Sequence, residues 1–157
     1  MLRFLLVLSV ASMIGLQGWR TLLNNFAVEW AHLDGNHIGI VQSVREIPGF
    51  LALLAVWVML IIKEHRLSAL SILVLGAGVS LTGFFPTFAG IAATTLLMSF
   101  GLHFYETTNQ SQTLQYFDPA TAPHVLGAIR SLSAATNVAV GAAVYFMSWY
   151  LDYRMMF

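Results

Sequence analysis

The chain has 157 residues, of which 58% are hydrophobic and only 9% are charged, and its formal net charge at pH 7 is zero. A mean hydropathy of +0.76 is too apolar for a soluble domain, in which about a quarter of the residues are charged. The single lysine, with no basic stripe, excludes nucleic acid as a partner, and the lack of cysteine excludes disulfides and thiolate catalysis. The composition therefore predicts an integral membrane protein surrounded by the lipid bilayer.

Five apolar stretches are each close to the roughly 20 residues that a bilayer requires. They are Leu2–Leu23, Ile38–Ile62, Leu67–Phe85, Phe88–Tyr105 and Val125–Leu151. All five are expected to be helices, because lipid cannot satisfy the open backbone groups of other structures. Short polar or proline-containing breaks separate them, and no stretch reads as a soluble domain. The predicted fold class is an all-α membrane bundle of five transmembrane helices.

The basic residues indicate how the chain is oriented. Arg3 precedes the first span, and Lys63 and Arg66 occupy the loop between the second and third spans. Because basic residues favour the cytoplasmic side, the N-terminus is predicted to be cytoplasmic, in the inner (plasma) membrane of a bacterium. An alternative stays open, in which Arg3 and the following apolar run form a signal peptide cleaved near Ser9-Val10-Ala11.

Two short segments recur at almost the same spacing. Gly15–Thr21 resembles Gly101–Thr107, 86 residues later, and Gly39–Ser43 resembles Gly127–Ser131, 88 residues later. The spacing predicts one three-helix repeat over residues 1–86 and an incomplete second repeat over residues 87–157, whose third helix is missing. An odd number of spans per repeat inverts the second copy, and inverted 3+3 repeats are typical of secondary transporters.

Polar residues inside the apolar stretches fall three or four apart, on one face of four of the five predicted helices. The faces are Gln17, Arg20, Thr21 and Asn24; Gln42, Arg45, Glu46 and Gly49; His103, Glu106, Thr107 and Gln110; and Arg130, Ala134, Asn137 and Gly141. Since intramembrane charges are costly, these faces are expected to meet one another or water. The third span is expected to face lipid and to pack through Gly76 and Gly78.

Depth along the helices sorts the charges into two layers. Arg20 and Glu46 are expected to pair in the outer half of the bilayer, next to Arg45. Glu106 and Arg130 are expected to meet in the inner half, together with His103, which precedes Glu106 by three residues. A carrier that alternates its access needs closure at both ends, and the two layers suit that purpose.

The paired segments and the uncharged third span resemble the N-terminal six-helix half of the major facilitator superfamily. The resemblance implies that spans one and four line a substrate cavity, that spans two and five flank it, and that spans three and six form a scaffold. The chain departs from that family in its short loop from Lys63 to Arg66, in the lack of an Arg-x-x-Gln-Gly pattern in span four and in the lack of a Gly-Pro pair in span five. It is therefore expected to be a divergent and truncated member of unassigned substrate, whose C-terminal half belongs to the same or a separate chain.

The sequence thus predicts the N-terminal portion of a secondary active transporter that moves a small-molecule solute by alternating access, with proton coupling as one option. Candidate substrate-cavity residues are Gln17, Arg20, Asn24, His103 and Asn137, and candidate coupling or gating residues are Arg45, Glu46, Glu106 and Arg130. For His103 and Glu106, a hydrogen-bonded packing role stays open beside proton coupling. The alternative function is a non-transporting module that packs with partner helices. No enzyme motif, metal site or cofactor is predicted.

Overall fold

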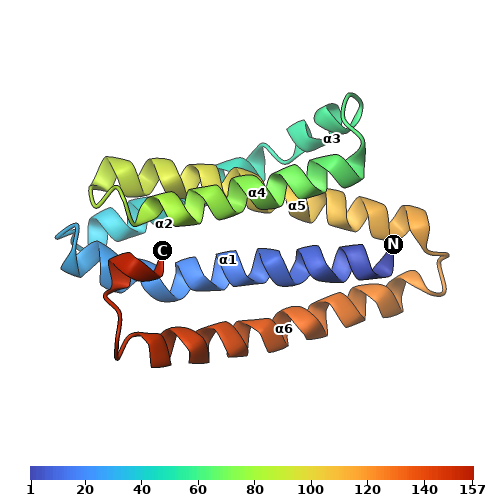
Figure 1. The fold of residues 1–157 in the computed structure, drawn as a ribbon. Coiled ribbons are helices and arrows are strands. Elements are labelled where there is room, and N and C mark those ends of the chain that lie inside the picture. The colour runs from blue at the N-terminus through green and yellow to red at the C-terminus, as the bar shows by residue number, and fades with distance from the viewer.

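The computed structural model describes residues 1–157, and every element in it is helical. In chain order the elements are α1 (Leu2–Glu29), α2 (Gly35–Phe50), α3 (Leu53–Met59), α4 (Glu64–Thr82), α5 (Phe88–Tyr116), α6 (Ala122–Met147) and the 3-10 turn η1 (Tyr153–Met156) (Figure 1). Four helices are long and apolar enough to cross a membrane, and the bent pair of α2 and α3 makes a fifth if it counts as one span. The expected all-α class is confirmed, whereas the inverted repeat stays a prediction.

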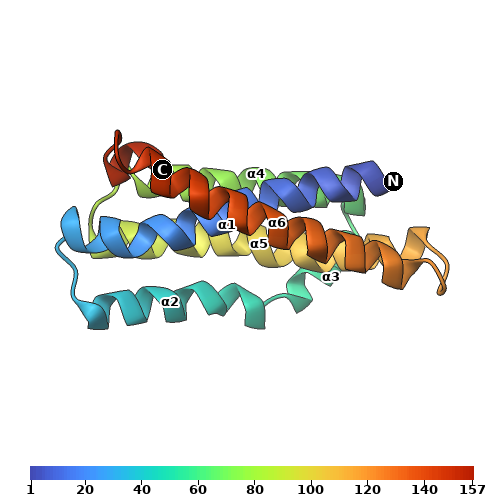
Figure 2. The same cartoon turned by 90° about the horizontal axis from the view of Figure 1, so that it is seen from below.

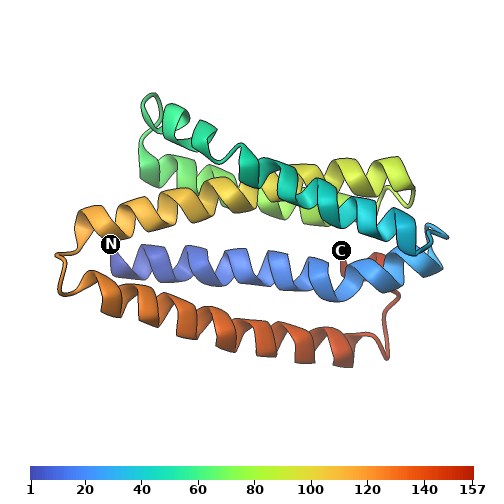
Figure 3. The same cartoon turned by 180° about the vertical axis from the view of Figure 1, so that it is seen from behind.

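The helices lie side by side, and α5 has the most neighbours. It packs on α4 over most of its length and also contacts α2, α3 and α1. Helix α6 packs mainly on α1 and forms one edge of the bundle, while α2 and α3 form the opposite edge (Figures 2 and 3). The N-terminus lies at one end of the bundle with the α3–α4 and α5–α6 connections, and the C-terminus lies toward the other end (Figure 1).

Small residues bring α4 and α5 into backbone contact. A Cβ atom on Gly78 of α4 would collide with the backbone of Met98, and one on Gly101 of α5 would collide with the backbone of Leu75. Close approach through small residues is how membrane helices gain packing energy without a hydrophobic driving force between them. The expected packing role of Gly78 is confirmed. That of Gly76 is wrong, because Gly76 faces open space and α4 rotates Gly78 instead toward α5.

Hydroxyl and amide side chains complete the α4–α5 interface. Ser68 donates a hydrogen bond to Thr108 over 2.7 Å and accepts one from Gln112, while Thr82 donates to Thr94 over 3.0 Å. All five side chains are buried. Each of these side chains therefore has a partner on the facing helix, as burial away from water favours, although the amide oxygen of Gln112 accepts no hydrogen bond.

The apolar core lies where α1, α4 and α5 meet. Helix α1 contributes a stripe of fully or almost fully buried residues three or four apart, namely Leu16, Trp19, Leu23 and Phe26. These residues pack against Leu75 of α4 and against Met98 and Leu102 of α5. The core thus joins the three helices that form the rigid centre of the bundle.

Two helices run further than the sequence suggests. Helix α1 continues through Asn24 and Asn25 to Glu29, because Phe26 and Ala27 extend its buried stripe and outweigh the low helix propensity of asparagine. Helix α5 continues eleven residues past Tyr105 to Tyr116, since its polar residues there bond to α4. The expected ends of the first and fourth spans, Leu23 and Tyr105, are therefore wrong.

The second expected span is broken. Helices α2 and α3 are bent by 45° relative to each other across Leu51 and Ala52, just after Pro48 and Gly49. Proline removes one backbone donor and crowds the preceding turn, and the chain continues through i to i+3 hydrogen bonds instead of regular helical ones. At Gly49 the chain passes close to α5, because an added Cβ would lie 3.2 Å from the ring of His103.

The paired glycines of the two expected repeats occupy matching surroundings. A Cβ on Gly15 of α1 would collide with the side chain of Leu75, the same α4 residue that faces Gly101 of α5. The other pair, Gly39 and Gly127, faces open space in both cases. Gly15 and Gly101 thus both lie next to Leu75, but Gly15 meets its side chain and Gly101 meets its backbone, so the repeat stays a prediction.

Candidate functional site

A cavity of about 570 Å³ lies between α1, α5 and α6. Its wall consists of Ser9, Ser12, Met13, Tyr105, Glu106, Asn109, Gln110, Leu126, Ile129, Arg130, Ser133, Ala134 and Asn137. The volume is within the range of about 300–1,000 Å³ that is typical of small-molecule sites. The mixture of apolar side chains with a few polar groups is also typical of such sites.

The cavity reaches from near the N-terminal end of the bundle toward its middle. Arg130 is eight residues into α6, about 12 Å from the start of that helix, and Asn137 is about 22 Å from it at 1.5 Å per residue. Glu106 is ten residues, or about 15 Å, before the end of α5. The two charged residues therefore lie at similar depth, well inside the helical part of the chain.

Glu106 and Arg130 face the cavity from opposite walls. The Glu106 carboxylate lies 3.5 Å from Nδ1 of His103, while Arg130 takes part in none of the ion pairs or side-chain hydrogen bonds of the structure. The Glu106 side chain is 54% exposed, so it can still reach a further partner. The expected inner group is thus gathered around one cavity, but without a direct bond between its opposite charges.

Three polar atoms on the cavity wall lack a hydrogen-bond partner. They are Oγ of Ser12, Oδ1 of Asn109 and Oδ1 of Asn137, and Ser12 is fully buried. The neighbouring Ser9 differs, because it donates to the backbone carbonyl of Leu5 and shares a 2.8 Å hydrogen bond with the Tyr105 hydroxyl. Buried polar atoms are rarely left unpaired. Trp19, Thr95 and Gln112 outside the cavity also carry such an atom, so the feature is not confined to the cavity wall.

A second group of charges lies between α1, α2 and α5. Arg45 bonds to Glu46 over 2.5 Å, and its guanidinium lies 5.7 Å from the centre of the Trp19 ring. The backbone carbonyl of Arg45 also accepts a hydrogen bond from Ser99 of α5. Arg45 therefore ties α2 to both of its neighbours.

His103 lies between this group and the cavity. Its ring faces Gly49 of α2 and contacts Glu106, and it is among the charged groups close enough to act on Glu46. No three His, Asp or Glu side chains converge anywhere in the chain. His103 therefore lies between the two expected layers of charge, with Glu106 on one side and the α2 residues near Glu46 on the other.

The structure separates the predicted site residues into two sets. Of the candidate substrate-cavity residues, only Asn137 lines the cavity; Gln17 bonds to Thr21 within α1, and Arg20 and Asn24 are exposed further along that helix. Of the candidate coupling residues, Glu106 and Arg130 line the cavity. Their roles stay predictions.

The expected ion pair between Arg20 and Glu46 is not formed. Glu46 pairs with Arg45, which is next to it in the chain and needs no second helix to reach it. Both Arg20 and Glu46 are exposed. The expectation of an outer contact between these two residues is therefore wrong, although Arg20 remains among the charges near Glu46.

Sequence reasoning missed five polar wall residues, namely Ser9, Ser12, Tyr105, Asn109 and Ser133. Ser9 and Ser12 are three residues apart on α1, so helical periodicity could have found them. Asn109 follows Glu106 by three residues on α5, so the same periodicity could have found it as well.

Comparisons with protein-family models, curated proteins and solved structures gave no match to this chain. The class of protein is therefore defined by the chain's own features. It is an all-helical protein with several helices long and apolar enough to cross a membrane, and it carries a polar, charged cavity among three of them.

Proposed function

We propose that this chain is the N-terminal portion of a secondary active membrane transporter that moves a small solute by alternating access. The observation that carries the proposal is the cavity of about 570 Å³ with Glu106 and Arg130 on its wall. A charge near the middle of a bilayer costs roughly 3 kcal/mol or more, so intramembrane charges that face a cavity point to a transport pathway.

The arrangement of neighbours supports the same proposal. Helix α5 is held firmly by α4, whereas α6 is buried only at Ala122, Val125 and Ile129 in its first two turns. Helix α6 packs along α1 but touches α5 only slightly, so a movement between α5 and α6 would disturb few contacts, as suits a carrier that must change the packing on one side of a bound solute. The broken span at Leu51 and Ala52 offers a second place for such a change.

Accessibility labelling tests alternating access without knowledge of the solute. Because the chain contains no cysteine, single-cysteine variants need no background removal. Ala134→Cys places a thiol on the cavity wall, and Ala139→Cys places one on an exposed position of the same helix, on the face turned away from the cavity. In sealed vesicles, a membrane-impermeant maleimide should label Ala134→Cys from one side, and a proton gradient should change that rate.

Ala139→Cys is the matched control, because on the proposed lipid-facing side of α6 a thiol stays protonated and reacts poorly. It should remain unlabelled from both sides under all conditions. An Ala134→Cys thiol that reacts at the same rate from the same side, with and without the gradient, would contradict alternating access.

Glu106 is the proposed coupling group; His103 lies 3.5 Å from its carboxylate, and Arg130 lines the same cavity. In the complete transporter, Glu106→Gln should abolish proton-driven uphill accumulation and leave solute exchange largely intact. Glu29→Gln, at the exposed end of α1, is the control. Uphill transport that survives Glu106→Gln would leave Glu106 with a structural role only.

The proposed orientation has the N-terminus in the cytoplasm. Arg3, Lys63 and Arg66 lie at one end of the bundle, and basic residues favour the cytoplasmic side (Figure 1). A phosphatase reporter fused after Phe157 should therefore be active outside the cytoplasm. A cytoplasmic signal from that fusion would reverse the orientation.

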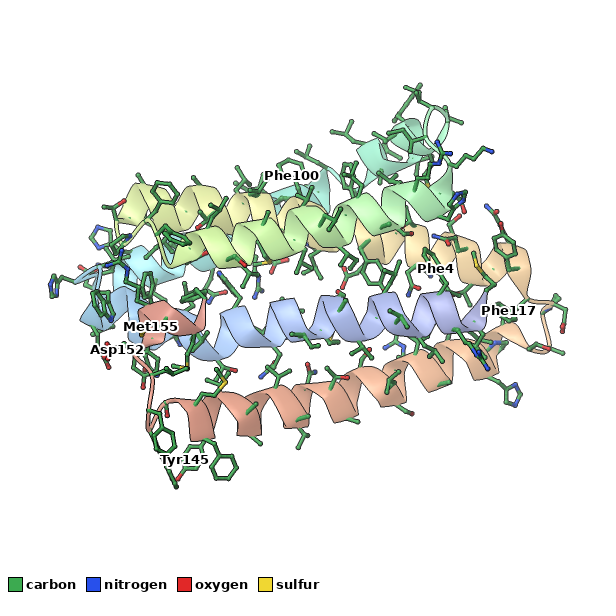
Figure 4. The ribbon with its side chains drawn as sticks, in the orientation of Figure 1. Phe4, Phe100, Phe117, Tyr145, Asp152 and Met155 are labelled. Atoms are coloured by element: carbon green, nitrogen blue, oxygen red, sulfur yellow. The ribbon has the colours of Figure 1, made fainter.

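The alternative function is a non-transporting module that packs with partner helices. Its support is the exposed far half of α6, where Val138, Tyr145 and Phe146 are all more than half exposed; Figure 4 shows Tyr145 at that end. A partner bundle could cover this surface. In that case the Ala134→Cys labelling pattern should not respond to a gradient.

A further inference from the structure

We infer that the cavity between α1, α5 and α6 binds a small free zwitterion, of the kind in which an ammonium group and a carboxylate are a few bonds apart, as in an α-amino acid. As the substrate class of the carrier, this inference rests on the function proposed above. It concerns the ligand itself, whereas that proposal concerns movement across the membrane.

The first argument is the charge of the wall. Glu106 and Arg130 face the same cavity from different helices, at similar depth, and Arg130 has no carboxylate partner in the structure. A ligand with a single charge would pair with only one of these two residues and would meet an unfavourable like charge at the other. A zwitterion pairs with both, its carboxylate with Arg130 and its ammonium with Glu106.

The second argument is the set of unpaired polar atoms. Asn109 and Asn137 line the cavity, and the Oδ1 atom of each accepts no hydrogen bond in the structure. Both oxygens are buried, so each amide has to turn about its side-chain bonds to present its oxygen to a ligand. An ammonium group carries three donors and no acceptor. Asn109 follows Glu106 by three residues on α5, so both lie on one side of that helix, where an ammonium group can meet them together.

The third argument is that the same atoms contribute little to the fold. Ser9 and Tyr105 on the same wall bond to each other, so hydroxyl groups there can be satisfied when they serve the fold. The hydroxyl of Ser12 and the amide oxygen of Asn137 form no hydrogen bond. Replacing either residue by an apolar one would therefore remove no hydrogen bond from the fold. The wall therefore contains one hydroxyl pair, Ser9 and Tyr105, that stabilises the fold, and further polar groups that form no hydrogen bond within the chain.

The test is ligand binding to the purified full chain in a maltoside detergent. Unfolding is followed by intrinsic tryptophan fluorescence while each of the common L-α-amino acids is added in turn. The amino acid that raises the unfolding temperature most is then studied by titration calorimetry. Its affinity is compared with that of the amine that lacks the carboxylate and with that of the acid that lacks the amino group. We expect each of these two analogues to bind at least about tenfold more weakly.

Variants locate the site. Arg130→Gln and Glu106→Gln should each weaken binding of the amino acid by about tenfold or more, and Arg66→Gln and Glu29→Gln, which remove charges outside the cavity, should leave it unchanged. Asn137→Leu separates binding from folding. It should weaken binding while leaving the unfolding temperature of the ligand-free chain unchanged or higher, whereas a structural role for Asn137 would lower that temperature.

Several outcomes would overturn the inference. One is that no amino acid binds, and another is that the amine or the acid alone binds as well as the zwitterion. A third concerns the headgroup of phosphatidylethanolamine, which also joins an ammonium group to an anion. If glycerophosphoethanolamine binds in the amino acid's place and the lipid copurifies with the chain, the cavity holds lipid and the inference fails.

The ligand class and the carrier function can fail separately. Binding of a zwitterion by a chain whose Ala134→Cys labelling never responds to a gradient would support the ligand class and contradict the carrier. Transport of a solute without the two charges, with responsive labelling, would support the carrier and overturn the ligand class.

Discussion

The α4–α5 interface and the cavity between α1, α5 and α6 contain similar side chains in opposite states. In the interface, Ser68, Thr108 and Gln112 bond to one another across the two helices. On the cavity wall, Ser12 and Asn137 have no partner. Helix α5 contributes to both regions, so the difference arises from its neighbours.

The difference follows from how closely the neighbouring helix approaches. Gly78 and Gly101 let α4 and α5 touch at the backbone, which brings short hydroxyl side chains within bonding distance. Helix α6 touches α5 only slightly, so most polar side chains on that side have no hydrogen-bond partner on the facing helix. Association of membrane helices depends on such packing and hydrogen bonding, and polar groups left without a partner are candidates for function.

The largest expected effect comes from breaking the close approach at the interface. Gly78→Leu forces a side chain into the backbone of Met98, and overpacking of this kind should cost about 3 kcal/mol or more of unfolding free energy. The measurement is an SDS unfolding titration in mixed micelles. Gly76→Leu, two residues away on the open side of α4, should change stability little; an equal loss in both variants would contradict the importance of this contact.

A smaller effect is expected from the hydrogen bonds of the interface. Ser68→Ala removes the acceptor of the buried Gln112 amide and one partner of Thr108, whose hydroxyl keeps its bond to the Tyr105 carbonyl; the change should cost about 1–2 kcal/mol. Ser133→Ala on the cavity wall removes a hydroxyl with no hydrogen bond across the helices. The same titration should find the cavity variant within about 0.5 kcal/mol of the parent chain.

Ser9 and Ser12, both on α1, allow paired and unpaired polar groups to be compared within the cavity wall. Ser9→Ala removes the bond to the Tyr105 hydroxyl and should destabilise the chain by about 1 kcal/mol. Ser12→Ala removes a buried hydroxyl without a partner, so stability should stay unchanged or rise slightly. If Ser12→Ala proves the more damaging of the two, the distinction between paired and unpaired wall groups is wrong.

The smallest expected effect is a loss of stability in acid that arises in the loops outside both regions. The backbone amide of His37 bonds to Asp34 at the start of α2, and the Thr121 hydroxyl bonds to Asp118 before α6; these bonds lower both pKa values below their ordinary value of 3.8. A lowered pKa in the folded chain means that the carboxylates stabilise the fold above about pH 4 and that this contribution is lost as pH falls through the lowered values.

Asp34→Asn and Asp118→Asn isolate that effect. Each should flatten the decline of the unfolding temperature below about pH 4 while leaving its value at neutral pH almost unchanged, because asparagine can still accept the capping bonds. An unchanged acid profile in the double variant would assign the decline to other carboxylates.

Local patterns predicted much of the fold. Apolar stretches and their breaks indicated the helices, because the bilayer sets the length of a span and tolerates few charges. The start of the fourth span at Phe88 was predicted, since Thr87 and Pro86 mark it locally. The grouping of Glu106 with Arg130 near one end of the bundle was also predicted, since depth along a helix follows from residue number alone.

Composition and periodicity thus determined by themselves that the chain is helical, that its helices are apolar enough to cross a membrane, and which faces carry polar residues. The tertiary structure decided where α1 and α5 end, that the second span breaks after Pro48, and that Glu46 pairs with Arg45 instead of Arg20. It also decided which polar groups are paired and which line the cavity. The physical reason is that helix formation depends on neighbours a few residues apart in the chain, whereas burial, pairing and cavities depend on which helix lies opposite.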